Sequence, residues 1–178
     1  MEKQTKKIAF CGVLGALAVA VMILGALIGI GTYASPALAG IVLLPAVAEY
    51  GAGTAALLYA AVSVLSVLLV PDKESSFLFV FLGWYPAARP AYNRVRPKAL
   101  AALLKFLTFN AAVTAAYALL IFVFRVSAVV SDYGAASSLL LAGLAAVGNI
   151  TFFVYDIALA RLARAYEIKL RPHLGGRT

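Results

Sequence analysis

The stretch 8–48 reads IAFCGVLGALAVAVMILGALIGIGTYASPALAGIVLLPAVA and contains no Asp, Glu, Lys or Arg. A helix needs roughly 20 apolar residues to cross a lipid bilayer, so this stretch is long enough for one full crossing and a further helix. Thr32, Ser35 and Pro36 interrupt it, because proline lacks the N–H that an inner helical turn requires. We therefore expect a membrane-spanning helix over 8–30 and a shorter helix over 36–49, in which Pro45 favours a kink.

The same lack of charge recurs further along the chain, in the stretches 50–71, 106–124 and 133–155. Gly51 and Gly53 mark a tight connection, and Pro71-Asp72-Lys73-Glu74 marks a polar turn. The pattern predicts further helices over 52–70, 76–93, 99–124 and 135–165. The expected fold is all-α, a single domain over 1–178 that crosses the membrane with six helices.

The composition supports this class of protein. Of the 178 residues, 64% are hydrophobic and 12% are charged, whereas a soluble domain has about 45–50% apolar and about 25% charged residues. An ordinary soluble enzyme, a disordered chain and a collagen-like fibre are therefore excluded. One cysteine, Cys11, and one histidine, His173, exclude a disulfide framework within the chain and any metal site built from several of these residues.

The distribution of Lys and Arg predicts the orientation in the cell membrane. If both termini are cytoplasmic, only Lys73 and Arg125 lie outside, and the other thirteen of the 15 basic residues lie inside. The inside group consists of Lys3, Lys6, Lys7, Arg89, Arg94, Arg96, Lys98, Lys105, Arg161, Arg164, Lys169, Arg171 and Arg177. Because basic residues concentrate in cytoplasmic loops, this orientation is favoured. The net charge of +8 then reflects these loops and does not indicate a nucleic-acid partner.

Enzyme motifs are missing from the sequence. The chain has no Gly-x-Ser-x-Gly elbow, no His-Glu-x-x-His pair and no Walker-type phosphate loop, and no two carboxylates share a helical spacing inside a membrane segment. We expect no covalent chemistry, no cofactor and no bound metal.

Charged residues near the membrane edge allow two interpretations. Glu49 and Asp156 lie at the ends of predicted helices, and Lys105 and Arg89 lie on the same side. They form either an ion pair that ties helices together or a proton or coupling-ion relay through the two acids. We favour the ion pair, because water and flexible side chains reduce the cost of charge at the edge.

Polar and aromatic residues inside the predicted spans are equally open to two interpretations. Asn110 and Asn149 either link helices by hydrogen bonds or face a ligand cavity. Trp84 and Tyr85 precede Pro86, which frees a backbone carbonyl inside a span. They either pack in the core or line an aromatic pocket for a flat heterocyclic ligand.

Small residues recur every four positions on the first predicted helix, at Gly12, Ala16 and Ala20. Such a stripe lets helices approach closely. It serves either packing within the bundle or docking of another membrane protein.

Taken together, these features resemble the S component, the substrate-binding membrane subunit of energy-coupling factor (ECF) transporters, in a branch found in Gram-positive bacteria. The resemblance covers nearly the whole chain and rests on its size, its six predicted helices and several short motifs. These motifs are Lys6-Lys7-Ile8-Ala9-Phe10, Ala16-Leu17-Ala18-Val19-Ala20, Val70-Pro71-Asp72-Lys73-Glu74, Gly83-Trp84-Tyr85-Pro86, Lys105-Phe106, Phe109-Asn110, Gly148-Asn149 and Tyr155-Asp156-Ile157-Ala158-Leu159.

The resemblance implies a transport function. An S component captures a small solute such as a vitamin or its precursor, and it docks through its first helix on a membrane coupling subunit driven by two cytoplasmic ATPases. The implied docking residues include Ala16 and Ala20. The implied ligand residues, towards the outer side, are Tyr33, Trp84, Tyr117, Asp132 and Tyr133. The histidine segment of the metal-binding branch is absent, which disfavours nickel or cobalt.

Three other functions remain as alternatives. A stand-alone secondary transporter or channel would need a polar path across the membrane, and an inverted repeat would support it. An integral membrane enzyme would need a catalytic site that the sequence does not display. A non-catalytic scaffold protein would be a tight bundle without a ligand site.

Overall fold

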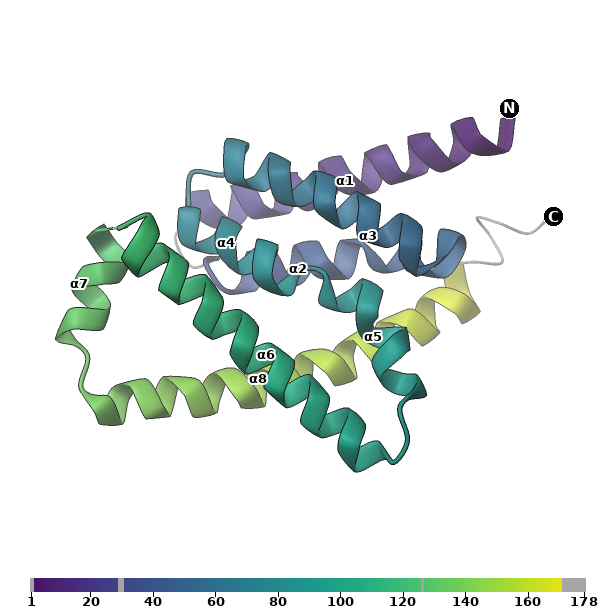
Figure 1. Ribbon diagram of the computed structural model, residues 1–178. Coiled ribbons are helices and arrows are strands. Elements are labelled where there is room, and N and C mark those ends of the chain that lie inside the picture. Colours follow the sequence, from purple (N-terminus) through teal and green to yellow (C-terminus); the bar gives the residue numbers. More distant parts are fainter. Residues whose placement is uncertain (1, 29–30, 126, 171–178) are drawn as a thin grey trace.

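The computed structural model describes residues 2–28, 31–125 and 127–170, and this part of the chain is all-α (Figure 1). The helices are α1 (Glu2–Ile28), α2 (Ala34–Val42), α3 (Leu44–Leu69), α4 (Lys73–Leu82), α5 (Tyr85–Arg94), α6 (Lys98–Ala118), α7 (Ser127–Ala135) and α8 (Ser138–Ala165). Two π-helical turns, η1 (Leu119–Val123) and η2 (Tyr166–Leu170), continue α6 and α8. The expected all-α class is confirmed.

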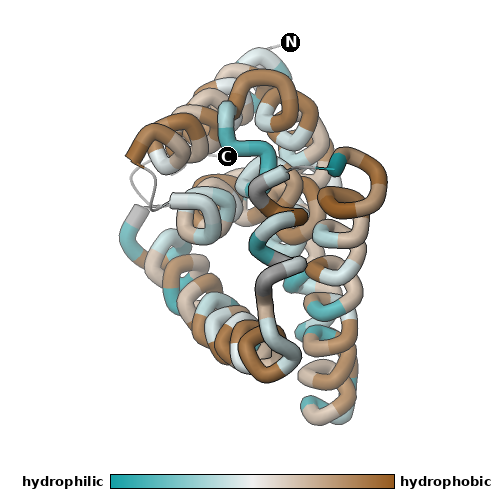
Figure 2. Tube along the Cα trace, turned by 90° about the vertical axis from the view of Figure 1, so that its left-hand side faces the viewer, coloured by the Kyte–Doolittle hydropathy of each residue, from teal (hydrophilic) through white to brown (hydrophobic). Residues whose placement is uncertain are grey.

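Four helical stretches are long and apolar enough to cross a membrane, namely Gln4–Ile28, Leu44–Leu69, Lys98–Val123 and Ser138–Lys169. Much of their surface is exposed, as at Phe122 (76%) and Leu139 (82%). In water such exposure would cost about 25 cal/mol of free energy per Å² of apolar surface, whereas contact with lipid tails avoids this cost. Hydrophobic residues cover most of the length of the helices in Figure 2. These are the properties of a multi-pass membrane protein.

The expected helix over 36–49 is wrong in its bounds. α2 ends at Val42 and α3 begins at Leu44, with Pro45 in its first turn. Proline is tolerated there because the N–H groups of the first turn have no acceptor within the helix. Leu43 keeps right-handed helical angles (φ −79°, ψ −13°) between them. The stretch 34–50 is therefore one bent helical pass.

Gly51 ends that pass and reverses the chain within α3. Its φ of 79° and ψ of 172° are non-helical and belong to a region that only glycine adopts readily. Before it, Tyr50 contacts Phe10 near the start of α1, at 5.8 Å between ring centroids. After it, the chain returns to the other end, where the Ser76 hydroxyl donates to the Ser66 carbonyl at 3.1 Å. The predicted helix over 52–70 is this returning part of α3.

The expected helix over 76–93 is also wrong, because it is divided and begins earlier. Asp72 caps α4 by accepting a hydrogen bond from the Ser75 N–H at 3.2 Å. α4 ends at Leu82, and α5 begins at Tyr85 with Pro86 in its first turn. A Cβ on Gly83 would lie 2.6 Å from the Phe79 carbonyl oxygen, so the bend between α4 and α5 requires a glycine there.

The last two predicted helices differ from the structure mainly at their ends. The helix predicted over 99–124 corresponds to α6 and η1. The helix predicted over 135–165 corresponds to α8, which begins at Ser138 because the Ser137 hydroxyl caps it by accepting from the Leu140 N–H at 3.2 Å. The short helix α7 between them is not predicted. The first helix begins at Glu2 rather than residue 8, and residues 29–30 lie outside the described part.

The two ends of the bundle differ in chemistry. α1 begins and α8 finishes at the same end, on the right in Figure 1. Lys7 lies 5.8 Å from the centre of the Tyr50 ring there, and Tyr166 Oη donates to Glu49 at 3.3 Å. We call this the basic end. At the other end the starts of α2 and α4 meet, since the Ser35 and Ser75 hydroxyls are 3.0 Å apart.

The core is unevenly distributed. Met22, Leu43, Val62 and Phe79 are almost completely buried where α1 to α4 pack together. A second, smaller cluster joins α8 to α5 and α3 through Tyr85, Phe152, Leu159 and Leu44, with Phe109 of α6 packed against it. The start of α8 is exposed, so α8 is held to the bundle by its second half.

Candidate functional site

An acidic and phenolic cluster lies at the end opposite the basic end, and we call it the Glu74 cluster. Tyr33 Oη and Tyr117 Oη both donate to Glu74 Oε1, at 3.0 and 2.7 Å, and the two hydroxyls are 3.4 Å apart. Nearby, Thr32 Oγ1 donates to Asp72 Oδ2 at 2.8 Å. The structure thus brings together two of the predicted ligand residues, Tyr33 and Tyr117.

The residues next to Glu74 in the sequence explain why its carboxylate is not paired with the neighbouring Lys73. Asp72 is the cap of α4, and Lys73 donates to the carbonyls of Val67 and Val70 at 2.9 and 3.1 Å, in the last turn of α3 and at its C-cap. Lys73 is therefore turned towards the end of α3. Across the described residues, lysine and arginine form ion pairs with Asp156 but not with Glu74. Among the described residues, the Glu74 carboxylate is therefore held by neutral donors and has no cationic partner.

Tyr33 is the accessible member of this cluster. It lies in the connection between α1 and α2, and 66% of it is exposed. Partial burial of the hydroxyl raises the pKa of Tyr33 above its ordinary value, and the charge of Glu74 acts in the same direction. The phenol therefore stays protonated and remains a hydrogen-bond donor at neutral pH.

The two candidate residues on α7 are not equally described. Asp132 is exposed, and its charge contributes to the raised pKa of Tyr33. Asp132 therefore adds to the negative character of this end without a hydrogen bond to the cluster. The side chain of Tyr133 lies outside the described residues.

Trp84 and Tyr85 do not join the Glu74 cluster. Trp84 Nε1 donates to the Phe81 carbonyl at 2.6 Å, and its ring lies 6.4 Å from the rings of both Tyr85 and Tyr92. Tyr85 is buried and lies edge-on to Phe152, at 4.9 Å between centroids. Both residues lie at the bend between α4 and α5, away from the Glu74 end of α4. Their ring contacts are those of core packing.

Asn110 and Asn149 bind each other. Asn110 Nδ2 donates to Asn149 Oδ1 at 2.8 Å, and Asn149 Nδ2 donates to Asn110 Oδ1 at 3.1 Å. Each amide also donates to the carbonyl four residues earlier in its own helix, at 2.8 Å. The structure therefore gives these two residues the role of a polar link between α6 and α8.

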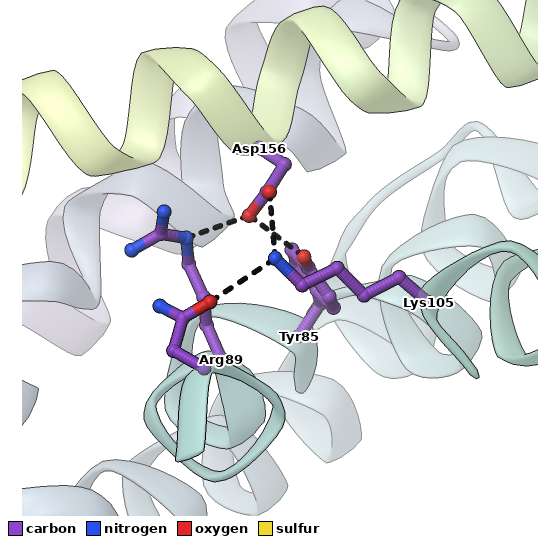
Figure 3. Close-up of polar contacts among 5 residues, drawn as sticks. Tyr85, Arg89, Lys105 and Asp156 are labelled. Carbon is purple, nitrogen blue, oxygen red and sulfur yellow. Dashed lines mark hydrogen bonds and ion pairs between the residues drawn. The ribbon is translucent and has the colours of Figure 1, made fainter. Parts of the chain in front are cut away.

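The charged residues near the basic end form a second cluster around Asp156 (Figure 3). Arg89 Nε lies 2.6 Å from Asp156 Oδ1, and Lys105 Nζ lies 2.8 Å from Asp156 Oδ2. Tyr85 Oη donates to Oδ1 at 2.7 Å, and Lys105 also donates to Asn93 Oδ1 at 3.1 Å. The side chains of Arg89, Lys105 and Asp156 are 9% to 17% exposed. This cluster joins α5, α6 and α8.

Glu49, the fourth residue of the expected ion-pair group, has a different contact. It accepts a hydrogen bond from Tyr166 Oη in η2 at 3.3 Å. The described ion pairs of the group are those of Arg89 and Lys105 with Asp156.

The small-residue stripe of α1 faces outwards. Gly12, Ala16 and Ala20 are exposed, and a Cβ placed on Gly12 would have no neighbour within 4 Å. The neighbouring Gly15 faces inwards instead, where a Cβ would lie 3.2 Å from Leu58. Packing within the bundle therefore uses Gly15, and the stripe Gly12, Ala16 and Ala20 is left exposed.

Sequence reasoning missed Glu74, Thr32 and Asp72 as site residues, because it treated 71–74 as a turn only. The available signal was a carboxylate just after a membrane span with no basic residue one helical turn further on. Nothing in the sequence pointed to Asn93. Across the described residues, no group of three His, Cys, Asp or Glu side chains lies together as a metal site would require.

Comparison of the chain with protein-family models, curated protein sequences and solved structures finds no significant match. A function for this chain therefore has to be inferred from the geometry of the two clusters.

Proposed function

We propose that this protein is the substrate-capturing membrane subunit of an ECF-type importer. It binds a small solute such as a vitamin or its precursor at the Glu74 cluster, and it delivers the solute inwards together with a coupling subunit and two ATPases. The observation that carries the proposal is the Glu74 carboxylate, which Tyr33 and Tyr117 hold at the end opposite Arg89, Arg161 and Arg164 and which forms no ion pair among the described residues. A carboxylate flanked by phenols suits a ligand with hydrogen-bond donors or a positive charge.

The proposed topology has six crossings with both termini in the cytoplasm. The four long spans supply four of them. The bent stretches 34–50 and 73–94 supply the other two, because each connects the Glu74 end to the basic end. The basic end is cytoplasmic by the distribution of Lys and Arg. The Glu74 cluster then opens to the outside, where a solute arrives.

The exposed stripe on α1 is the proposed docking surface. Gly12, Ala16 and Ala20 present little side-chain bulk, so a helix of the coupling subunit can approach the α1 backbone closely. The residues that pack α1 inside the bundle, such as Gly15, lie on another face, so docking leaves the bundle intact.

The contacts around Asp156 weigh against a stand-alone secondary transporter. Two cations already compensate its charge. Between Asp156 and the Glu74 cluster, Phe109 and Phe152 stack at 4.5 Å and the two asparagines bind each other. A proton or ion would have no continuous polar path through these residues.

The test is a pull-down of the tagged protein from the membranes of its own host in mild detergent. We expect a membrane coupling subunit and two ATPases to co-purify, as identified by mass spectrometry. The double substitution Ala16→Leu and Ala20→Leu should remove these partners, because the added bulk prevents close approach. The control carries Ala102→Leu and Ala111→Leu, two exposed alanines of α6, and should keep them. A clean preparation without ATPases from the unmodified protein would refute the proposal.

A further inference from the structure

We infer that a hollow at the basic end, between α5 and the end of α8, binds the phosphate of an anionic phospholipid. The inference rests on the proposed placement of this end at the cytoplasmic membrane surface, but not on transport. The hollow has a volume of about 440 Å³. Its lining includes Arg89 from α5 and Ile157, Arg161, Arg164 and Ile168 from α8 and η2.

The spacing of the α8 residues explains how one surface is formed. Ile157, Arg161, Arg164 and Ile168 follow one another at intervals of four, three and four residues, which places them on one face of the helix. Arg89 reaches the same hollow from α5, so two separate elements contribute guanidinium groups to it.

The charges of the hollow favour an anion. Three arginines line it together with a single carboxylate, Asp156. That carboxylate is compensated by Arg89 and by Lys105, at 2.6 and 2.8 Å. Arg161 and Arg164 are exposed, and their guanidinium groups are left to face an outside anion.

The ion pair with Asp156 also orients Arg89. It contacts the carboxylate through Nε, and its two terminal nitrogens point away from Asp156 (Figure 3). In the described chain these terminal nitrogens have no hydrogen-bond partner. A guanidinium group held in this way can donate two parallel hydrogen bonds to a phosphate.

The apolar part of the lining favours a lipid over a free phosphate ion. Ile157 and Ile168 are exposed, and Ala160 and Ala165, which flank Arg161 and Arg164 in the sequence, also line the hollow. A free ion would gain nothing from these side chains, whereas an acyl chain can lie against them below its headgroup. Basic pockets between helices on the cytoplasmic side are typical sites for anionic headgroups.

The test is native mass spectrometry of the full chain in detergent, titrated with phosphatidylglycerol. Phosphatidylcholine with the same acyl chains and inorganic phosphate are titrated in parallel. We expect retention of phosphatidylglycerol only. The double substitution Arg161→Gln and Arg164→Gln should weaken its binding by about tenfold or more. The control, Arg94→Gln and Arg96→Gln, removes the same charge from the connection after α5 and should change binding much less.

Three results would overturn the inference. Equal weakening in both double variants would mean diffuse attraction by the basic end. Equal retention of phosphatidylcholine would mean that the acyl chains alone bind. Competition by inorganic phosphate at lipid concentrations would mean that the site takes a free anion. If the double variant is not recovered folded, the single substitution Arg164→Glu replaces it with the same expected loss. A failed search for ATPase partners would leave this result unaffected.

Discussion

Glu74 and Asp156 both carry a carboxylate, but the groups that surround the two carboxylates differ. Glu74 accepts hydrogen bonds from two tyrosine hydroxyls, and Asp156 is bound by an arginine and a lysine. The charge of Asp156 is therefore compensated within the chain, which makes it a structural link. The charge of Glu74 is not, which makes Glu74 the better candidate for recognition of a ligand.

The first prediction concerns Glu74. The substitution Glu74→Gln removes the charge but keeps the shape, so charge-assisted hydrogen bonds are lost and solute affinity should fall by about tenfold or more. The measurement is the amount of small molecule released when freshly purified protein is denatured, determined by mass spectrometry. Glu49→Gln, at the other end of the bundle, is the control and should retain the solute. Equal solute content in both variants would move the binding site away from Glu74.

The second prediction concerns Asp156. The substitution Asp156→Asn leaves Arg89 and Lys105 without their counter-charge in a largely buried site. Breaking such a pair costs roughly 3 kcal/mol, the low end of the range for buried pairs, because these side chains are still partly exposed. We expect a clear drop in the thermal unfolding temperature in detergent. Asp132→Asn changes an exposed carboxylate and should leave that temperature unchanged. Equal stability of the two variants would show that the cluster does not hold α5, α6 and α8 together.

At the scale of elements, single residues decide where the helical passes bend and reverse. Gly51 reverses the chain in α3, Pro45 and Pro86 begin new helical segments, and Gly83 allows α4 to bend into α5. These residues divide the long apolar sequence into successive helical passes. They also bring the start of α4, with Glu74, back to the same end as Tyr33.

The third prediction tests the reversal at Gly51. Alanine at this position must adopt a φ of 79°, and such strain costs of the order of 1–3 kcal/mol. The space around it is open, since a Cβ would meet nothing within 4 Å, so the effect is one of the backbone alone. Gly51→Ala should therefore lower the thermal unfolding temperature.

Gly53 provides a control of opposite sign. A Cβ there also meets nothing within 4 Å, and the residue is helical. Gly53→Ala should raise stability by up to about 1 kcal/mol, because alanine is the better helix former. A Gly51→Ala variant as stable as Gly53→Ala would contradict the assigned turn.

At the scale of the whole molecule, the bundle has one basic end and one end with acidic and phenolic groups. The start of α1 and the end of α8 share the basic end (Figure 1). In a membrane this asymmetry favours one orientation, with the basic end towards the cytoplasm. Under the proposed function, the Glu74 end captures the solute, and the basic end contacts anionic lipid.

The fourth prediction concerns this direction. The chain has a single cysteine, so single-cysteine variants can be made in a Cys11→Ala background. A membrane-impermeant maleimide should label Asp132→Cys in intact cells, because the proposed orientation places α7 outside. It should label Arg96→Cys only after lysis. Labelling in the reverse order would invert the proposed orientation, and labelling of both in intact cells would contradict the crossing between them.

The all-α class and the four long apolar spans follow from the sequence by itself. An apolar run without charge is a local property, and a membrane helix satisfies its backbone hydrogen bonds within the same segment. Pro45 predicted a kink in the second helix, but the exact break at Leu43 and the break at Gly83 and Trp84 were not predicted, because these residues keep right-handed helical angles and change the composition little. The helix α7 was also not predicted, since it is short and contains both polar and apolar residues.

The candidate site was decided by the tertiary structure. Glu74 meets Tyr33 and Tyr117 across sequence separations of 41 and 43 residues, and Tyr85 meets Asp156 across 71. The resemblance implied Tyr33 and Tyr117 as ligand residues, and the sequence left Tyr85 open between core packing and an aromatic ligand pocket. The fold separated them, because hydrogen-bonding partners are set by how the helical passes lie side by side. The residue type determines what a side chain can bind. The packing of the helical passes determines which partner it contacts.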